Sequence, residues 1–117
     1  MRARILHFES LDVDLRTYVP RDASDDGVWL RMFVGPTDGP GEESFDVLVC
    51  TPAWLQRVAA EQGPQIGRHH LIVSKMDMSL VEEFLRGRVE QLDEPAWEGL
   101  AEKIGRIGSW EFEDYRP

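Results

Sequence analysis

The sequence contains a single cysteine, Cys50, among its 117 residues. One cysteine excludes an intrachain disulfide, and a chain of this length can build a hydrophobic core without such a crosslink. The scarcity of cysteine fits a reducing cytosol. No apolar run reaches the length of a signal peptide or a membrane span, so we expect a cytoplasmic protein.

Positive charge is also scarce. The 13 lysine and arginine residues face 22 aspartate and glutamate residues, which gives a formal net charge of -9. A nucleic-acid-binding protein needs the opposite sign to neutralise phosphates, so we expect DNA, RNA and anionic membranes not to be partners. Two interpretations of the acidity remain: it keeps the protein soluble, or it attracts a basic macromolecular partner.

Motifs for nucleotide or metal binding are missing too. The glycine-rich stretch "GPTDGPG" has neither the lysine nor the following helix of a phosphate-binding loop, so we interpret it as a hairpin loop. The three histidines and the cysteine do not have the spacing of metal ligands. The sequence therefore predicts no metal, no cofactor and no catalytic residue.

One enzymatic alternative stays open. Cys50 precedes the N-terminus of a predicted helix, where the helix dipole lowers the pKa of a thiol. His69 or His70 could act as its base, although adjacent residues of a strand point to opposite faces and only one could serve. The neighbouring Val47 and Val49 favour a buried, inert thiol instead.

Strand patterns dominate the first half of the chain. Residues 28–36, "VWLRMFVGP", and 44–50, "SFDVLVC", are rich in β-branched and aromatic residues and flank a Gly/Pro loop, which predicts an antiparallel hairpin. Residues 2–9 predict a first strand, and residues 15–19 an extended piece that ends at Pro20. A further strand is predicted within residues 67–75.

Three helices are expected in the second half. Residues 51–63 begin with Thr51 as N-cap and end at Gly63. Residues 79–92 begin with Ser79 and Glu82 as a capping box. The buried stripe predicted for this second helix is Leu80, Val81, Phe84, Leu85, Val89 and Leu92. Residues 94–105, with Pro95 at the start, form the third helix, and the helical tryptophans, Trp54 and Trp97, should be buried.

The chain closes with the alternating segment "SWEFED", residues 109–114. Alternation predicts a short edge strand with Trp110 and Phe112 facing the core and Glu111 and Glu113 facing solvent. If such an edge paired with a second copy, the protein would be an oligomeric scaffold, which is another open alternative.

Residues 1–117 therefore predict one domain of the α+β class, with element order β-β-β-α-β-α-α-β. We expect a mostly antiparallel sheet of four or five strands with three helices packed on one face. The order of the predicted elements leaves the position of the last strand in the sheet open.

Four stretches carry a resemblance to a known family: "RARILHFESLDVDL", "GPGEESFDVLVCTPAWL", "GRHHLIV" and "IGSWEFEDY". Together, and in this order, the chain resembles the immunity protein 8 family of bacterial polymorphic toxin systems. The resemblance implies an α+β fold and a non-enzymatic role, namely binding and neutralising a cognate toxin domain encoded nearby. It implies no catalytic residues.

The charge and the resemblance together motivate a hypothesis about the partner. Nucleases act on a polyanion and tend to be basic, so an acidic inhibitor can associate with them rapidly and cover the active cleft. We hypothesise that carboxylates in predicted loops and in the C-terminal segment form the partner-binding surface. These residues are Asp25, Asp26, Glu42, Glu43, Glu111, Glu113 and Asp114.

Overall fold

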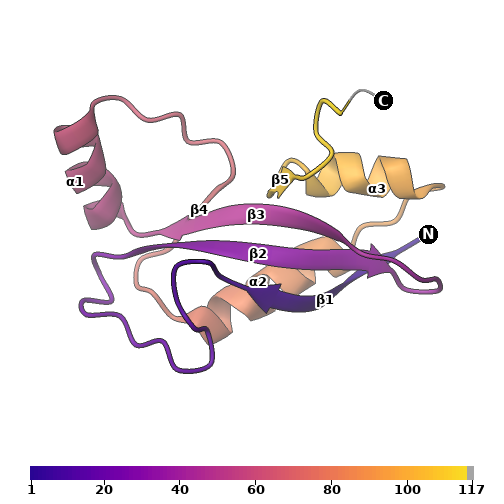
Figure 1. Cartoon of the computed structure of the whole chain (residues 1–117), viewed down its shortest axis with the longest axis horizontal. Coiled ribbons are helices and arrows are strands. Elements are labelled where there is room, and N and C mark those ends of the chain that lie inside the picture. The colour runs from indigo at the N-terminus through magenta and orange to yellow at the C-terminus, as the bar shows by residue number, and fades with distance from the viewer. Residues whose placement is uncertain (116–117) are drawn as a thin grey trace.

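The computed structural model describes residues 1–115 and contains the predicted elements in the predicted order (Figure 1). The α+β class is therefore confirmed. The elements are β1 (Ala3–Glu9), β2 (Gly27–Pro36), β3 (Glu43–Cys50), α1 (Pro52–Gln62), β4 (His70–Ile72), α2 (Met78–Glu90), α3 (Trp97–Ile104) and β5 (Ser109–Trp110).

The sheet is mixed and mostly antiparallel. β2 and β3 form the predicted hairpin, with a register that runs from Gly27 opposite Cys50 to Val34 opposite Glu43. β1 pairs antiparallel with β2, along the edge of β2 that faces away from β3. β4 pairs parallel with the end of β3, and β5 pairs antiparallel with its beginning, at Phe45 and Asp46. Both short strands therefore lie on the same side of β3.

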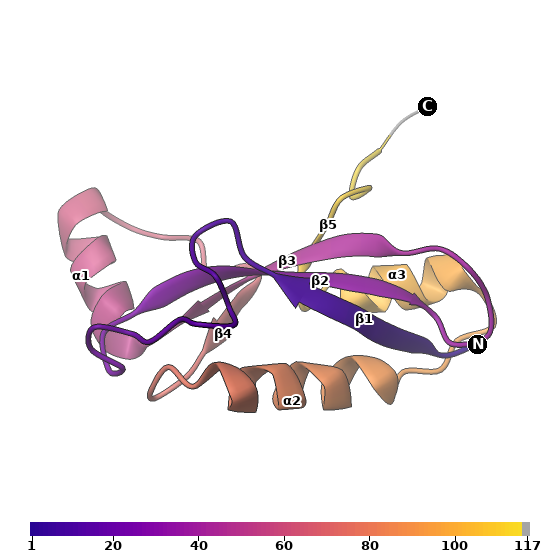
Figure 2. The same ribbon diagram turned by 60° about the horizontal axis from the view of Figure 1, so that its bottom comes forward.

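The core lies on one face of this sheet. Alternate residues of β2 and β3 are fully buried there, and α2 runs along the same face (Figure 2). Burying each such side chain stabilises the fold by about 1.5–3 kcal/mol. The buried helical residues are Val81, Leu85 and Val89 of α2 and Leu100, Ala101 and Ile104 of α3.

The other face of the sheet, called here the outer face, carries the alternate residues of β2, namely Trp29, Arg31 and Phe33. The Trp29 side chain is 45% exposed. The Phe33 ring stacks on the His7 ring with 4.2 Å between centroids. α1 lies at the end of the sheet where β2 begins (Figure 1).

The first turn of α2 differs from the prediction. Its N-cap is Asp77, whose carboxylate accepts a hydrogen bond from the Leu80 backbone at 3.3 Å, so the capping box at Ser79 is wrong. Leu80 and Phe84 are 62% and 50% exposed. The buried stripe is narrower than expected because α2 meets the sheet along a single row of residues at four-residue spacing.

Two extended segments are also shorter than predicted. Residues 15–17 form a turn and residues 18–20 have no regular structure, so the extended piece predicted over residues 15–19 does not form a strand. β5 ends at Trp110, after which the backbone turns, with Glu113 N–H donating to the Trp110 carbonyl at 3.0 Å. The alternation therefore breaks: Phe112 is 40% exposed and Glu113 is half-buried. Phe112 instead packs edge-on against the Trp110 ring, at 6.0 Å.

α1 is attached to the sheet mainly through its first turn. Thr51 is the predicted N-cap, and its hydroxyl accepts a hydrogen bond from the Trp54 backbone at 3.4 Å. The Trp54 ring lies over Gly27, where an added Cβ would come within 2.4 Å of the indole. α1 has no buried residue, and Trp54 is only half-buried. Trp97 of α3 is half-buried too, so the prediction that both tryptophans are buried is wrong.

Candidate functional site

The seven carboxylates predicted to bind a partner lie in two separate groups. Asp25 and Asp26 directly precede β2, beside the end of β3. Glu42 and Glu43 lie at the opposite end of the hairpin, where Glu43 pairs with Val34. Seven residue steps of about 3.3 Å separate these ends, so the two groups are about 23 Å apart. They do not form one continuous cluster.

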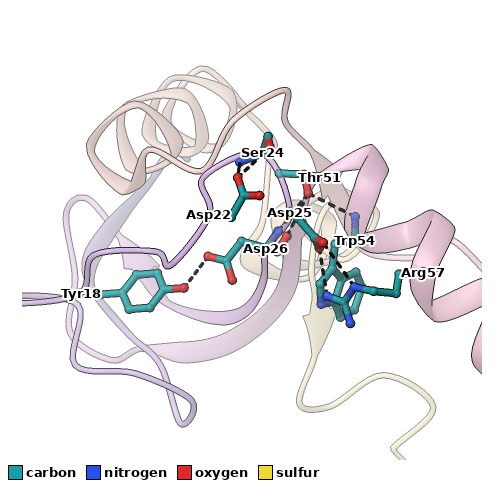
Figure 3. A network of polar contacts seen from close by, with 8 residues as sticks. All are labelled: Tyr18, Asp22, Ser24, Asp25, Asp26, Thr51, Trp54 and Arg57. Atoms are coloured by element: carbon teal, nitrogen blue, oxygen red, sulfur yellow. Dashed lines mark hydrogen bonds and ion pairs between the residues drawn. The ribbon is translucent and has the colours of Figure 1, made fainter.

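The first group is engaged within the fold (Figure 3). Asp25 forms an ion pair with Arg57 of α1, with 2.9 Å between the guanidinium nitrogen and the carboxylate oxygen. The Asp26 carboxylate accepts a hydrogen bond from the Tyr18 hydroxyl, and the Asp26 backbone N–H donates to Thr51 Oγ1 at 3.0 Å. Burial and the bond to Asp26 raise the pKa of Tyr18 to about 12. These contacts fasten residues 10–26 to the start of α1.

Glu43 is engaged as well. Its Oε1 accepts a hydrogen bond from the Trp97 indole at 3.0 Å, and its Oε2 accepts one from the Trp110 indole at 2.7 Å. A buried or half-buried indole N–H needs an acceptor, because leaving it without one costs free energy. One carboxylate thus joins β3 to α3 and β5.

The C-terminal carboxylates lie beside the hairpin. Glu111 Oε1 accepts a hydrogen bond from the Ser44 backbone at 2.8 Å, which places the Glu111 side chain next to residues 42–44. Glu113 forms an ion pair with Arg68. Glu42 and Asp114 are exposed. We call the carboxylates of this end the hairpin–tail group: Glu42, Glu43, Glu111, Glu113 and Asp114.

A charged row on the outer face was not anticipated from the sequence. Arg31 of β2 makes two hydrogen bonds to Asp46 of β3, at 2.8 and 2.9 Å. These bonds raise the pKa of Arg31, and the fields of Glu111 and Glu9 add to the effect. One guanidinium therefore lies among three carboxylates that come from different strands and from the C-terminal segment.

A hollow of about 280 Å³ adjoins this row. It is lined by Leu11 and Asp12 of the loop after β1, by Trp29, Leu30 and Arg31 of β2, and by Asp46 of β3. Asp12 Oδ2 accepts a hydrogen bond from the Trp29 backbone at 2.7 Å, which fixes the loop after β1 against β2. Leu11 is 88% exposed. The hollow thus combines exposed apolar surface with carboxylates.

The contacts around Cys50 do not favour the enzymatic alternative. Cys50 is fully buried, and burial raises the pKa of its thiol, which is the reverse of activation. The His69 ring donates from Nε2 to the Gly105 carbonyl at 2.7 Å, and the His70 ring donates from Nδ1 to the Arg68 carbonyl at 2.9 Å. Within residues 1–115, no three potential ligands converge on a point where a metal ion could sit.

These features define a small α+β protein that exposes carboxylates and aromatic side chains. Its sequence matches the model of the family described as Immunity protein 8 over residues 3–115, so the chain belongs to that family. The family is one of immunity proteins of toxin systems, which implies a non-enzymatic inhibitor role. No curated protein and no solved structure shows significant similarity. Among the described residues, every helix is too short or too polar to cross a bilayer.

Proposed function

We propose that this chain binds and neutralises a cognate toxin domain by covering a basic toxin surface with an acidic one. Membership of the Immunity protein 8 family is the observation that carries this proposal, since it supports a toxin partner. The net charge of -9 supports a basic partner, such as a nuclease domain, because opposite net charges speed association.

The proposed contact surface is the hairpin–tail group together with the outer face that it adjoins. Glu42 and Asp114 are exposed, and Glu111 is exposed although one of its oxygens accepts the Ser44 N–H. These three carboxylates are open to a partner. Glu43 and Glu113 are instead bonded within the fold. Glu43 binds the two tryptophans and Glu113 binds Arg68, which holds this end of the hairpin and the C-terminal segment together. Asp25 and Asp26 form a second acidic site at the far end of the sheet.

Co-expression tests the general proposal. The toxin domain encoded by the neighbouring gene should arrest bacterial growth when expressed alone, and this chain should restore growth. A complex should form between the purified proteins. If growth stays arrested and no complex forms, the chain does not act as the immunity protein of that toxin.

Charge reversal tests the acidic surface. Glu42→Lys combined with Glu111→Lys should slow association with the toxin domain at least tenfold at low salt and weaken its dependence on ionic strength. The matched control is the change of two exposed residues elsewhere, Glu61→Lys of α1 and Glu83→Lys of α2, which alters the net charge equally. Equal rates for the two variants would show that the hairpin–tail group does not contact the toxin.

A further inference from the structure

We infer that the hollow beside Trp29 on the outer face receives an arginine side chain of the bound toxin domain. This inference rests on the proposed function and names the contact through which it works. It also assigns a role to Leu11, Asp12 and Trp29, none of which is among the seven partner-binding residues predicted from the sequence.

The hollow has the dimensions of a site for one side chain. Its volume of about 280 Å³ falls just below the range of about 300–1,000 Å³ that is usual for small-molecule pockets. Trp29 is 45% exposed and Leu11 is 88% exposed, so two large apolar side chains border it in contact with water. A large aromatic residue at a concave, partly open position is the usual anchor of a protein interface.

The charges around the hollow select a cation. Asp12 and Asp46 line it, and Glu9 and Glu111 lie close enough to act on Arg31. Carboxylates thus outnumber the single guanidinium, which is already bound to Asp46 through two hydrogen bonds. Asp12 Oδ2 accepts the Trp29 N–H, whereas within residues 1–115 its Oδ1 accepts no hydrogen bond. Asp12 Oδ1 can therefore accept a hydrogen bond from a partner without the loss of an internal contact.

Arginine matches both the aromatic and the acidic lining of the hollow better than lysine does. Its planar guanidinium stacks on an aromatic face and donates hydrogen bonds in the plane of the group at the same time. The indole of Trp29 offers the face, Asp12 offers the acceptor, and Leu11 covers the aliphatic stem. The hollow lies beside the proposed surface, because Asp46 lines the hollow and pairs with Ser109, two residues before Glu111 of the hairpin–tail group.

The test is to measure binding by surface plasmon resonance, with a catalytically inactive form of the toxin domain encoded by the neighbouring gene. Trp29→Ala should weaken binding about thirtyfold or more, the effect of losing a central aromatic anchor. Asp12→Asn should weaken it less, about threefold to tenfold, because the amide oxygen still accepts the Trp29 N–H. Phe84→Ala is the matched control: Phe84 is 50% exposed, but it lies on α2, which packs on the other face of the sheet. It should leave affinity unchanged.

Two further measurements identify the occupant. Hydrogen exchange should show protection of residues 10–13 and 29–31 in the complex. Each toxin arginine is then replaced by alanine and measured against wild-type and Trp29→Ala protein. Replacing one toxin arginine should weaken binding to the wild type at least tenfold but should hardly change binding to Trp29→Ala, since the effects of coupled residues are not additive.

The outcomes separate the two claims. If the toxin domain neither binds nor is neutralised, the proposed function fails and this inference fails with it. If it binds tightly but Trp29→Ala behaves like Phe84→Ala, the inference alone is wrong. Coupling of Trp29 to a toxin lysine or to an apolar residue, with no arginine coupled, also overturns the assignment of an arginine.

Discussion

Replacing Glu43 with glutamine should destabilise the protein, although Glu43 is only the first residue of β3, next to an acidic loop. The carboxylate accepts one indole N–H on each oxygen, from Trp97 at 3.0 Å and from Trp110 at 2.7 Å. Glutamine has the same shape but only one acceptor oxygen. Its amide NH₂ group would face the second indole N–H, so that two donors would oppose each other.

The size of the effect follows from the two bonds. A hydrogen bond to a charged group contributes about 1.5–3 kcal/mol to stability. Glu43 is half-buried, so water can partly replace a lost bond and the lower end of that range applies. Glu43→Gln should therefore cost about 1.5 kcal/mol, and Glu43→Ala, which loses both bonds, about 3 kcal/mol.

Urea unfolding followed by far-UV circular dichroism measures this cost without relying on tryptophan fluorescence, which the substitution itself changes. With a slope of about 1.5–2 kcal/mol per molar urea, the Glu43→Gln midpoint should fall by about 0.8–1 M. Glu42→Gln is the control, because it removes the same charge from an exposed neighbour. Its stability should stay within about 0.5 kcal/mol of the wild type. Equal midpoints for the two glutamine variants would refute the structural role of Glu43.

Three further predictions concern stability. Gly27→Ala should cost about 1–3 kcal/mol, because its Cβ would lie 2.4 Å from the Trp54 indole; in a Trp54→Ala background the same change should cost almost nothing in urea unfolding, and an equal cost would contradict the clash. Burial and the bond to Asp26 raise the pKa of Tyr18 to about 12, so the neutral hydroxyl stabilises the fold fully below the ordinary value of about 10, and this stability is lost as pH rises toward 12. The ultraviolet difference titration between wild type and Tyr18→Phe should therefore show its step near pH 12, and a step near 10 would be inconsistent with that bond. Asp77→Ala should cost about 1 kcal/mol in thermal or urea unfolding, whereas Ser79→Ala should be nearly neutral, and the reverse order would restore the capping box.

The parts of the fold that were predicted correctly depend on local signals. The hairpin follows from two β-rich runs around a Gly/Pro loop, and α1 from Thr51, Pro52 and Gly63 at its ends. These signals act over a few residues, where propensity and hydrogen bonding of the backbone decide the structure. The element order and the α+β class then follow from the succession of such segments.

The candidate site could not be predicted in the same way, because it depends on contacts between distant residues. The indoles that bind Glu43 lie 54 and 67 positions further along the chain. The pairing of Arg31 with Asp46 requires the register of the β2–β3 ladder, and a shift of one residue would turn either side chain to the other face. Local patterns carry no information about such partners.

Exposure on α2 shows a different limit. Leu80 and Phe84 repeat at helical spacing, which predicted burial, yet each is at least half exposed. Periodicity identifies the apolar side of a helix but not the width that the neighbouring sheet covers. α2 meets the sheet through Val81, Leu85 and Val89, so residues one position earlier lie on its flank.

The internal use of several carboxylates bears on how the acidity acts. Glu43, Asp26 and Glu113 are bonded within the fold, yet each still contributes to the total charge of the molecule. Long-range attraction depends on that total and is screened beyond about 10 Å at 0.1 M salt. Close contact depends on the carboxylates and aromatics that remain open. Neutralising an engaged carboxylate should therefore change association rates only at low salt, whereas Trp29→Ala should raise the dissociation rate at every ionic strength.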